Sequence, residues 1–391
     1  MKKILLLTLI SLVGNVFLFS LKAQTNLSDS IISGGIYRSF IVYVPAVYSH
    51  SKAVPLVFDL HGLGSNNAQQ EFYGEFRPIA DTADFIIVLP NGTVGPNGRG
   101  WNNFAAPGTG VNDLGFISAL IDTLEKRYAI DPYRIYSTGM SNGGFMTYDL
   151  ACFMNQRFAA IASVAGSMIL SHKSACSPQH PTPVMEIHGT ADPLVSYPGN
   201  GGIVSSVDID TLVKYWVSYN RCNPVAVVTQ LPDINTSDGC TAEHQVFSNG
   251  TKGSSVELYK IIGGGHSWPG AAFATSNGPT NQDFSASKEI WRFFSQYRLN
   301  NLQTGIADEL RDGFEVLLYP NPAGETFQIQ VGQSTSGPCT IRLYNDLGAE
   351  VRSYALNGTE LRIERGTLPA GLYVVRLEAN NRNLFRKVLF R

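Results

Sequence analysis

This chain of 391 residues has almost no net charge. Its 29 basic and 31 acidic residues leave a formal net charge of −2, and charged residues make up only 15% of the total. Without a strong positive field, the protein as a whole attracts neither the phosphates of a nucleic acid nor an anionic membrane surface. We therefore expect no nucleic-acid partner.

Long apolar segments are equally scarce, and only one stretch is long enough to cross a membrane. It runs from Ile4 to Leu21, follows two lysines and is interrupted by polar residues. Together with the small residue Ala23, this pattern predicts a signal peptide over residues 1–23 that is cleaved on export. An uncleaved anchor is the alternative. No cysteine precedes Cys152, which argues against a lipid anchor.

Cysteine is also rare, and Cys339 stands apart from the other four cysteines. Export makes disulfides possible, and proximity in sequence favours pairs between Cys152 and Cys176 and between Cys222 and Cys240. Four free, buried thiols are the alternative. The spacings do not match those of a zinc site, so we expect no metal.

What the chain does contain, up to about residue 300, is a regular alternation of two patterns. Short apolar runs bounded by turn residues predict buried strands, and helical patterns such as Phe116 to Tyr128 lie between them. Such alternation is typical of a mostly parallel sheet with helices on both faces, closed here by an expected helix from Ser287 to Tyr297. The strands are expected at 40–44, 56–60, 85–89, 135–138, 159–164, 184–188 and 256–262.

Beyond residue 300 the pattern changes. Residues 301–313 are polar and charged, which predicts a linker after a main domain of residues 24–300. Residues 314–391 contain short strand-like segments between Gly, Asn and Pro turns, which predict a small all-β sandwich. Its strands are expected at 315–319, 326–331, 340–345, 350–355 and 372–377.

The strongest chemical signal is the segment Gly139-Met140-Ser141-Asn142-Gly143-Gly144. Its G-x-S-x-G core follows a predicted strand and precedes a helical stretch, the context in which a serine on a sharp turn projects its hydroxyl above a sheet. The flanking glycines allow the backbone to turn without a Cβ clash. We expect Ser141 to be a nucleophile; an ordinary glycine-rich turn is the alternative.

A serine nucleophile needs an acid and a base, which in this arrangement follow it in the order acid, then histidine. Asp192 lies in the turn after a predicted strand, and only His244 and His266 come later. His266 lies on a glycine-rich loop after another strand, whereas His244 lies in a polar stretch typical of a solvated surface. We predict Asp192 and His266 as the partners of Ser141. The alternative acids, which could equally begin a helix, are Asp208 and Asp210.

The same chemistry needs N–H donors for the negative charge that develops on the substrate oxygen. The expected donors are the backbone N–H groups of Asn142, which follows the nucleophile, and of Leu63, in a glycine-flanked loop after an early strand. His61, at the start of that loop, is expected to be structural. Trp101 and Trp268 are candidates for the walls of a substrate pocket, with packing in the core as the alternative.

Four motifs follow one another along the chain: Leu60-His61-Gly62-Leu63-Gly64-Ser65, the Gly139–Gly144 segment, His188-Gly189-Thr190-Ala191-Asp192 and Gly263-Gly264-Gly265-His266-Ser267-Trp268. With these, residues 30 to 300 resemble the polyhydroxybutyrate depolymerase-like and feruloyl esterase-like enzymes of carbohydrate esterase family one. The resemblance implies an α/β-hydrolase fold, a triad of Ser141, Asp192 and His266, and a secreted carboxylic-ester hydrolase without a cofactor. It also supports a disulfide between Cys152 and Cys176.

The tail carries its own motifs: Tyr319-Pro320-Asn321-Pro322-Ala323, Asn345-Asp346-Leu347-Gly348 and Leu368-Pro369-Ala370-Gly371-Leu372-Tyr373. In these it resembles the C-terminal sorting domain of the type IX secretion system. The resemblance implies that residues from about 314 engage the outer-membrane secretion machinery, are often removed, and leave the enzyme extracellular or attached to the cell surface. A substrate-binding accessory module is the alternative.

An export tail suits a substrate polymer too large to enter the cell. We therefore expect feruloyl or acetyl esters of plant polysaccharide as the substrate of a monomeric enzyme. Polyhydroxyalkanoate or another polyester is an alternative substrate. Two further functions fit the same scaffold, namely a serine peptidase and a non-catalytic polysaccharide-binding protein.

Overall fold

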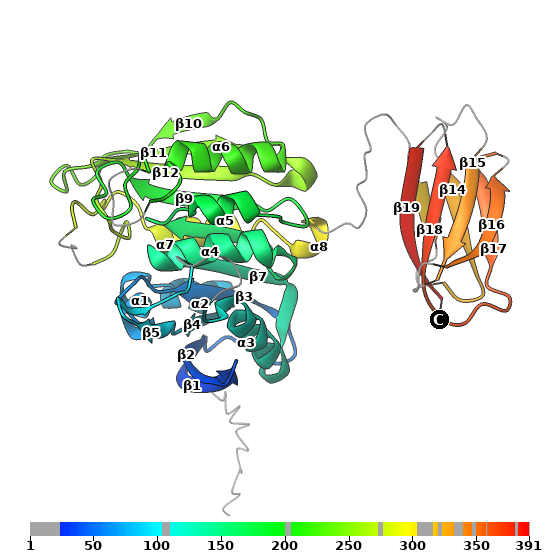
Figure 1. Ribbon diagram of the computed structural model, residues 1–391, viewed down its shortest axis with the longest axis horizontal. Helices are drawn as coiled ribbons and strands as arrows, with labels where there is room; N and C mark the ends of the chain where they lie inside the picture. The colour runs from blue at the N-terminus through cyan, green and yellow to red at the C-terminus, as the bar shows by residue number, and fades with distance from the viewer. Residues whose placement is uncertain are drawn as a thin grey trace, which may run out of the picture. The chain divides into compact units, whose positions relative to one another are not determined.

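The computed structural model divides into two compact units, one within residues Met1–Leu302 and one within Gln303–Arg391 (Figure 1). The predicted signal peptide, residues 1–23, and most of the predicted linker lie outside the described residues. The described residues are 24–103, 110–199, 205–272, 277–302, 316–319, 323–331, 339–345, 349–356, 358–379 and 382–390.

The main unit is built on a ten-stranded sheet with the order β1-β2-β4-β3-β7-β8-β9-β12-β11-β10. The neighbours from β4 to β12 are parallel, and the strands at both edges pair antiparallel. The expected mostly parallel sheet is thereby confirmed. The strands are β1 (Thr25–Ser33), β2 (Ile36–Val44), β3 (Val54–Leu60), β4 (Ile86–Pro90), β7 (Ile130–Met140), β8 (Ala160–Val164), β9 (Val184–Gly189), β10 (Val227–Gln230), β11 (Thr241–Phe247) and β12 (Val256–Ile262), and a separate hairpin joins β5 (Thr93–Gly95) to β6 (Gly98–Gly100).

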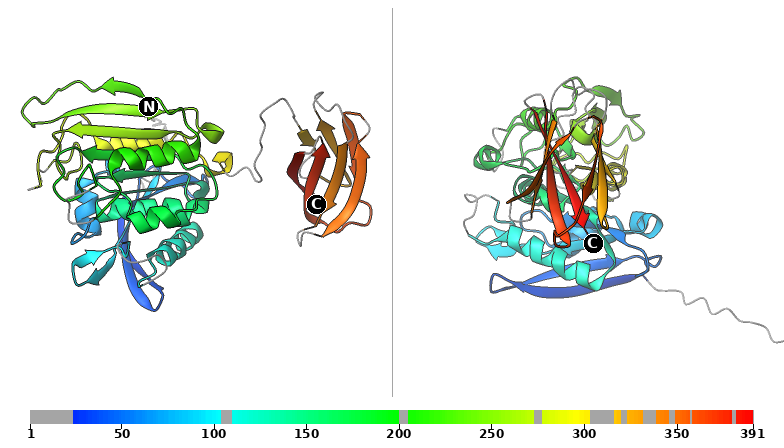
Figure 2. Two further views of the ribbon diagram at one scale, coloured as in Figure 1. Left: turned by 45° about the horizontal axis from the view of Figure 1, so that its top comes forward. Right: turned by 90° about the vertical axis from the view of Figure 1, so that its right-hand side faces the viewer.

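Helices cover both faces of this sheet, as Figures 1 and 2 show. On β3, Val57 packs in one core with α2 and α7, whereas Leu56 and Phe58 pack in a second core with α3 and α4. Alternate side chains of a strand point to opposite faces, so the two cores lie on opposite sides of the sheet. The helices are α1 (Asn67–Tyr73), α2 (Arg77–Ala83), α3 (Asp113–Arg127), α4 (Asn142–Phe153), α5 (Leu170–Ala175), α6 (Ile209–Asn220), α7 (Ala286–Phe294) and α8 (Leu299–Leu302), with short 3₁₀ turns at Asn155–Arg157 and Thr251–Gly253.

The sequence patterns did not predict β1 and β10, the two strands at the edges of the sheet. Most residues of β1 and all four residues of β10 are exposed, so neither strand shows the apolar run that marks a buried strand. No helix among the described residues is long and apolar enough to span a membrane.

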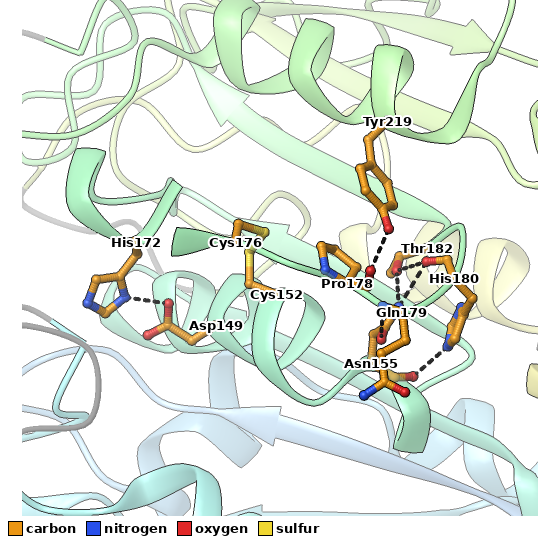
Figure 3. Close-up of a disulfide and its surroundings, with 10 residues drawn as sticks. All are labelled: Asp149, Cys152, Asn155, His172, Cys176, Pro178, Gln179, His180, Thr182 and Tyr219. Carbon is orange, nitrogen blue, oxygen red and sulfur yellow. Dashed lines mark hydrogen bonds and ion pairs between the residues drawn. A yellow bond between two sulfur atoms is a disulfide. The ribbon is translucent and has the colours of Figure 1, made fainter. Parts of the chain in front are cut away.

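One predicted disulfide is present. Cys152, near the end of α4, is bonded to Cys176, which directly follows α5. Figure 3 shows this bond close to a buried hydrogen bond of 2.6 Å between Asp149 on α4 and His172 on α5. Two contacts, one covalent, therefore hold the short helix α5 against α4, the helix that directly follows Ser141.

The predicted pairing of Cys222 with Cys240 is wrong, because both thiols are free and buried. Cys222 packs in the core that contains Leu258, while Cys240 packs in the core that contains Tyr259. These neighbouring residues of β12 point to opposite faces, so the sheet itself separates the two cysteines. Their proximity in sequence does not carry over into space.

The second unit is all-β, as expected. A sheet of order β13-β14-β17 and a sheet of order β16-β15-β18-β19 share one core, in which Phe327 and Ile329 of β14 meet Ile341 and Leu343 of β15. The side chains on β14 and β15 alternate between buried and partly exposed, as in a sandwich. The strands are β13 (Val316–Tyr319), β14 (Thr326–Val331), β15 (Cys339–Tyr344), β16 (Glu350–Leu356), β17 (Glu360–Glu364), β18 (Gly371–Ala379) and β19 (Arg382–Phe390); the sequence patterns missed β17 and β19.

Candidate active site

The candidate catalytic residues all follow parallel strands of the main sheet. Ser141 comes directly after β7, Asp192 after β9 and His266 after β12, while the loop with Leu63 follows β3. The carboxyl ends of parallel strands share one edge of the sheet, which is where α/β proteins place their ligand sites. The topology therefore gathers at one edge four segments that are far apart in sequence.

Ser141 lies on a sharp turn between β7 and α4. Its backbone has φ +55° and ψ −119°, a conformation that residues with a side chain rarely adopt and that indicates local strain. The turn requires glycine at position 143, because a Cβ there would overlap the carbonyl oxygen of Leu60 on β3. A hydrogen bond of 2.9 Å from the Ser141 N–H to the Val164 carbonyl ties the turn to β8. This is the geometry that exposes a nucleophile at the start of a helix.

Asp192 and His266 are joined by a buried hydrogen bond. The Nδ1 atom of His266 lies 2.7 Å from Oδ2 of Asp192, and the two residues are 4% and 5% exposed. The other carboxylate oxygen, Oδ1, accepts the backbone N–H groups of Leu194 and Val195 at 2.8 and 2.9 Å. The structure thus brings together the two residues that the sequence placed on separate loops.

The ionisation of Asp192 follows from these contacts. Burial alone raises the pKa of Asp192, but the hydrogen bond and positive charge of His266, with His188 and the backbone donors, outweigh burial and lower the pKa. An ionised Asp192 can only accept, so Nδ1 of His266 carries the proton and the lone pair of the neutral ring is on Nε2. That tautomer is the one a general base needs.

Two backbone N–H groups stand beside Ser141. Asn142 is the first residue of α4, so its N–H has no acceptor within the helix. The Leu63 N–H makes no hydrogen bond within the described residues. Gly62 lies next to Ser141, since a Cβ at Gly62 would be 3.4 Å from the Ser141 Cβ. The arrangement fits the two predicted oxyanion donors.

The side chain of Asn142 is held by a polar clasp that the sequence patterns did not reveal. Its Oδ1 accepts the backbone N–H of Trp101 at 2.7 Å, and its Nδ2 donates to Oδ1 of Asn103 at 2.7 Å. Asn103 in turn donates from its Nδ2 to the Asn142 carbonyl at 2.7 Å. All three residues are buried. Such reciprocal bonds hold Asn142, the residue whose backbone N–H is the expected oxyanion donor.

His61 is structural, as expected. It is fully buried, its Nε2 accepts the Gly92 N–H at 3.0 Å, and its Nδ1 lies 2.7 Å from the Gly62 carbonyl. Burial lowers the pKa of His61 to about 4, so the ring is neutral at pH 7. Trp101 donates from Nε1 to the His61 carbonyl at 2.9 Å, which links this loop to the Asn142 clasp.

The two tryptophans proposed for the pocket wall are buried. Trp101 is 3% exposed and Trp268 is 2% exposed, and both indole N–H groups donate within the protein. Trp268 packs edge-on against Phe76, and its Nε1 donates to Ser287 at 3.1 Å. Both rings belong to core clusters, and their place in a substrate pocket stays a prediction.

The remaining candidate residues have structural roles. His244 is only partly exposed and lies on β11, where its Nε2 is 2.7 Å from Glu257 and its ring stacks on Tyr259. Asp208 caps α6 by accepting the Thr211 N–H at 2.8 Å, so it begins a helix. Within the described residues no group of three or more His, Cys, Asp or Glu could hold a metal ion.

Two family models match parts of the chain. Residues 317–391 match the secretion system C-terminal sorting domain, and residues 70–175 match the prolyl oligopeptidase family. The second match includes Ser141 and Asn142 but stops before Asp192 and His266.

Curated relatives match part of this chain. A bifunctional acetylxylan esterase/xylanase from Neocallimastix patriciarum is 27% identical, over 68% of this chain and 34% of its own length. Feruloyl esterase B from Piromyces equi is 29% identical, over 59% of this chain and 42% of its own. Feruloyl esterase C from Emericella nidulans is 31% identical, over 49% of this chain and 64% of its own. The chain thus spans only about a third to two fifths of the first two relatives.

Fold, site and comparisons define the class of this protein. The main unit has an α/β-hydrolase fold with a serine at the turn after β7, and residues 317–391 form a secretion sorting domain. The protein is therefore exported, to the outside of the cell or to its surface. More particularly, the chain is similar over part of its length to feruloyl and acetylxylan esterases.

Proposed function

We propose that this protein is a serine carboxylic-ester hydrolase in which Ser141 is the nucleophile, His266 the base and Asp192 the orienting acid. The observation that carries the proposal is the buried hydrogen bond between Asp192 and His266 at the sheet edge where Ser141 occupies its strained turn. A structural histidine alone would not need an ionised carboxylate on Nδ1 and a strained serine at the same edge.

The reaction would proceed through an acyl-enzyme. Ser141 Oγ attacks the ester carbonyl carbon while Nε2 of His266 takes its proton, and the Leu63 and Asn142 N–H groups stabilise the resulting oxyanion. Collapse of this intermediate breaks the bond to the alcohol, which leaves with the proton from His266. A water molecule, deprotonated by the same histidine, then releases the acid and restores Ser141.

Esters of plant polysaccharide are the proposed substrates, either feruloyl or acetyl groups. One reason is that the relatives are named as feruloyl or acetylxylan esterases. The other is the match to a sorting domain, because an exported enzyme reaches polymers that cannot enter a cell. The sorting domain would bring the chain to the outer-membrane secretion machinery.

The first experiment measures turnover of the purified protein on methyl ferulate, acetylated xylan, polyhydroxybutyrate and para-nitrophenyl acetate. We expect activity on the ferulate or the xylan, and we expect Ser141→Ala to lower kcat by about 10⁴-fold or more without unfolding the protein. Activity that survives in Ser141→Ala would overturn the nucleophile, and clearing of polyhydroxybutyrate alone would replace the substrate.

A serine peptidase is the second candidate, because residues 70–175 match the prolyl oligopeptidase family. The same triad could in principle cleave an amide. Comparing the ester and the amide of the same acyl group, for example para-nitrophenyl and para-nitroanilide derivatives, separates the two functions. Serine-dependent cleavage of the amide at a rate similar to that of the ester would favour the peptidase.

A further inference from the structure

Behind Asp192 lies a second buried histidine that the proposed reaction does not use. His188 is the next-to-last residue of β9, four residues before Asp192, and neither its side chain nor that of Glu186 reaches solvent. The Nε2 atom of His188 lies 2.8 Å from the Val195 carbonyl and 3.5 Å from Oδ2 of Asp192. The ring therefore faces the same carboxylate oxygen that His266 contacts.

The contacts determine where the protons of His188 lie. A carbonyl can only accept, so Nε2 carries a proton that points toward Val195 and Asp192. On the other side of the ring, Nδ1 lies 2.9 Å from Oε1 of Glu186, whose Oε2 accepts the Tyr148 hydroxyl at 2.8 Å. Two acidic side chains thus flank one imidazole ring. Burial by itself lowers the pKa of His188, but Glu186 and Asp192 outweigh burial and raise the pKa.

We propose that His188 and Glu186 form a charged positioning pair that clamps the loop carrying Asp192 and weakens the hold of Asp192 on His266. The inference rests on the proposed catalytic role of Asp192 and His266. His188 fixes the loop at Val195, whose N–H also donates to Asp192 at 2.9 Å. Its positive charge, on the side toward Asp192, partly offsets the carboxylate charge that His266 experiences.

Other polar groups surround the pair on every side. Tyr197 packs edge-on against the His188 ring at 5.9 Å, and its hydroxyl donates to Asp210 on α6 at 2.6 Å. Lys260 on β12 is the register partner of His188, and its Nζ lies 5.0 Å from the centre of the Tyr197 ring. Among the described residues, the acidic side chains within 3.5 Å of the His188 ring are those of Glu186 and Asp192.

The change that tests this pair is Glu186→Gln. A glutamine can accept the Tyr148 hydroxyl and donate to Nδ1 of His188, so the hydrogen bonds persist while His188 becomes neutral. Asp192 then holds the protonated His266 more tightly, and the pKa of His266 rises. We expect the acid limb of the pH profile of kcat/KM to move up by about 0.5 pH unit or more, which lowers kcat/KM about threefold at pH values below the limb.

Two measurements keep this inference separate from the proposed function. The first is the pH profile of kcat/KM on para-nitrophenyl acetate. The second is NMR of protein with ¹⁵N-labelled histidine, in which the His266 signals are assigned by comparison with His266→Asn. The NMR follows the titration of His266 whether or not the protein turns over an ester. Absence of Ser141-dependent turnover would overturn the proposed function, while the NMR titration would still decide the role of His188. His188→Gln, which also removes the charge, should shift His266 in the same direction.

The matched control is Glu257→Gln, another buried carboxylate bonded to a histidine. Glu257 lies at the opposite end of β12 from the site, as its register pairing with Met185 rather than Gly189 indicates, and its Oε2 is 2.7 Å from His244. We expect no shift of His266 in this variant. An unchanged or lowered pKa of His266 in Glu186→Gln, or an equal shift in Glu257→Gln, would overturn the positioning role.

Discussion

At the scale of single residues, burial makes His61 a group that no longer titrates near neutral pH. His61 is neutral in the fold because burial lowers its pKa to about 4, whereas an exposed histidine has a pKa of about 6.5. The unfolded chain therefore binds a proton at His61 between these values and the folded chain does not. The contribution of His61 to stability is present above pH 6.5 and is lost as the pH falls toward 4.

Replacing His61 by glutamine should flatten this dependence. Glutamine can accept the Gly92 N–H but does not titrate. Between pH 7 and 4, His61 should lower the free energy of unfolding of the wild type by up to about 3 kcal/mol. We expect this loss to be absent from His61→Gln. Urea unfolding of both proteins at several pH values measures it. His50→Gln, at an exposed site, is the control; equal pH slopes for wild type and His61→Gln would contradict the account.

At the scale of elements, short turns after the strands carry the chemistry, and buried side chains hold those turns in place. Asn103 is the clearest example, because its amide bonds both the side chain and the carbonyl of Asn142. The expected oxyanion donor belongs to the same residue as the oriented side chain. Small displacements of such a donor strongly reduce transition-state stabilisation.

Asn103→Ala should lower kcat by about 10- to 100-fold with little change in KM, because the lost bonds position a group that acts mainly in the transition state. Steady-state kinetics on para-nitrophenyl acetate measures the effect. Asn97→Ala, at the exposed tip of the β5–β6 hairpin, is the matched control and should behave as wild type. A rise in KM alone would mean that Asn103 contributes to substrate binding instead.

At the scale of the whole molecule, a single disulfide closes a segment of the main unit. Cys152 and Cys176 are 24 residues apart in sequence, so the bond restricts the unfolded chain. For a loop of this length the stabilisation is about 3 kcal/mol. The free, buried thiols of Cys222 and Cys240 add no such restraint.

Replacing Cys152 and Cys176 together by alanine should therefore lower the free energy of unfolding of the main unit by about 3 kcal/mol, measured by urea titration. A reducing agent supplies the internal control. It should destabilise the wild type by a similar amount and have no further effect on the double variant; a similar loss in both proteins would assign the stabilisation to something other than the disulfide.

The division into two units makes a second prediction at this scale. All candidate site residues lie within Met1–Leu302, so a chain that ends at Leu302 should keep the kcat/KM of the full protein. Expressed in a host with the matching secretion system, however, it should stay inside the cells, because it lacks the sorting domain. Assays of cells and medium test both statements, and secretion of the shortened chain would contradict the second.

The sequence by itself determined the turns that carry the chemistry and the class of each unit. The G-x-S-x-G pattern between a strand-like and a helical stretch predicted the turn at Ser141, and the expected order of acid and histidine after the serine selected Asp192 and His266. The short strand-like segments between Gly, Asn and Pro turns likewise predicted β14 and β15.

Only the tertiary structure decided the contacts made across the sheet and between loops. It separated Cys222 from Cys240 by placing them on opposite faces, and it buried both tryptophans, because packing depends on neighbours that are distant in sequence. It also placed His188 behind Asp192. In sequence His188 is one histidine in a turn motif, and its role depends on the three-dimensional position of two carboxylates that no local pattern specifies.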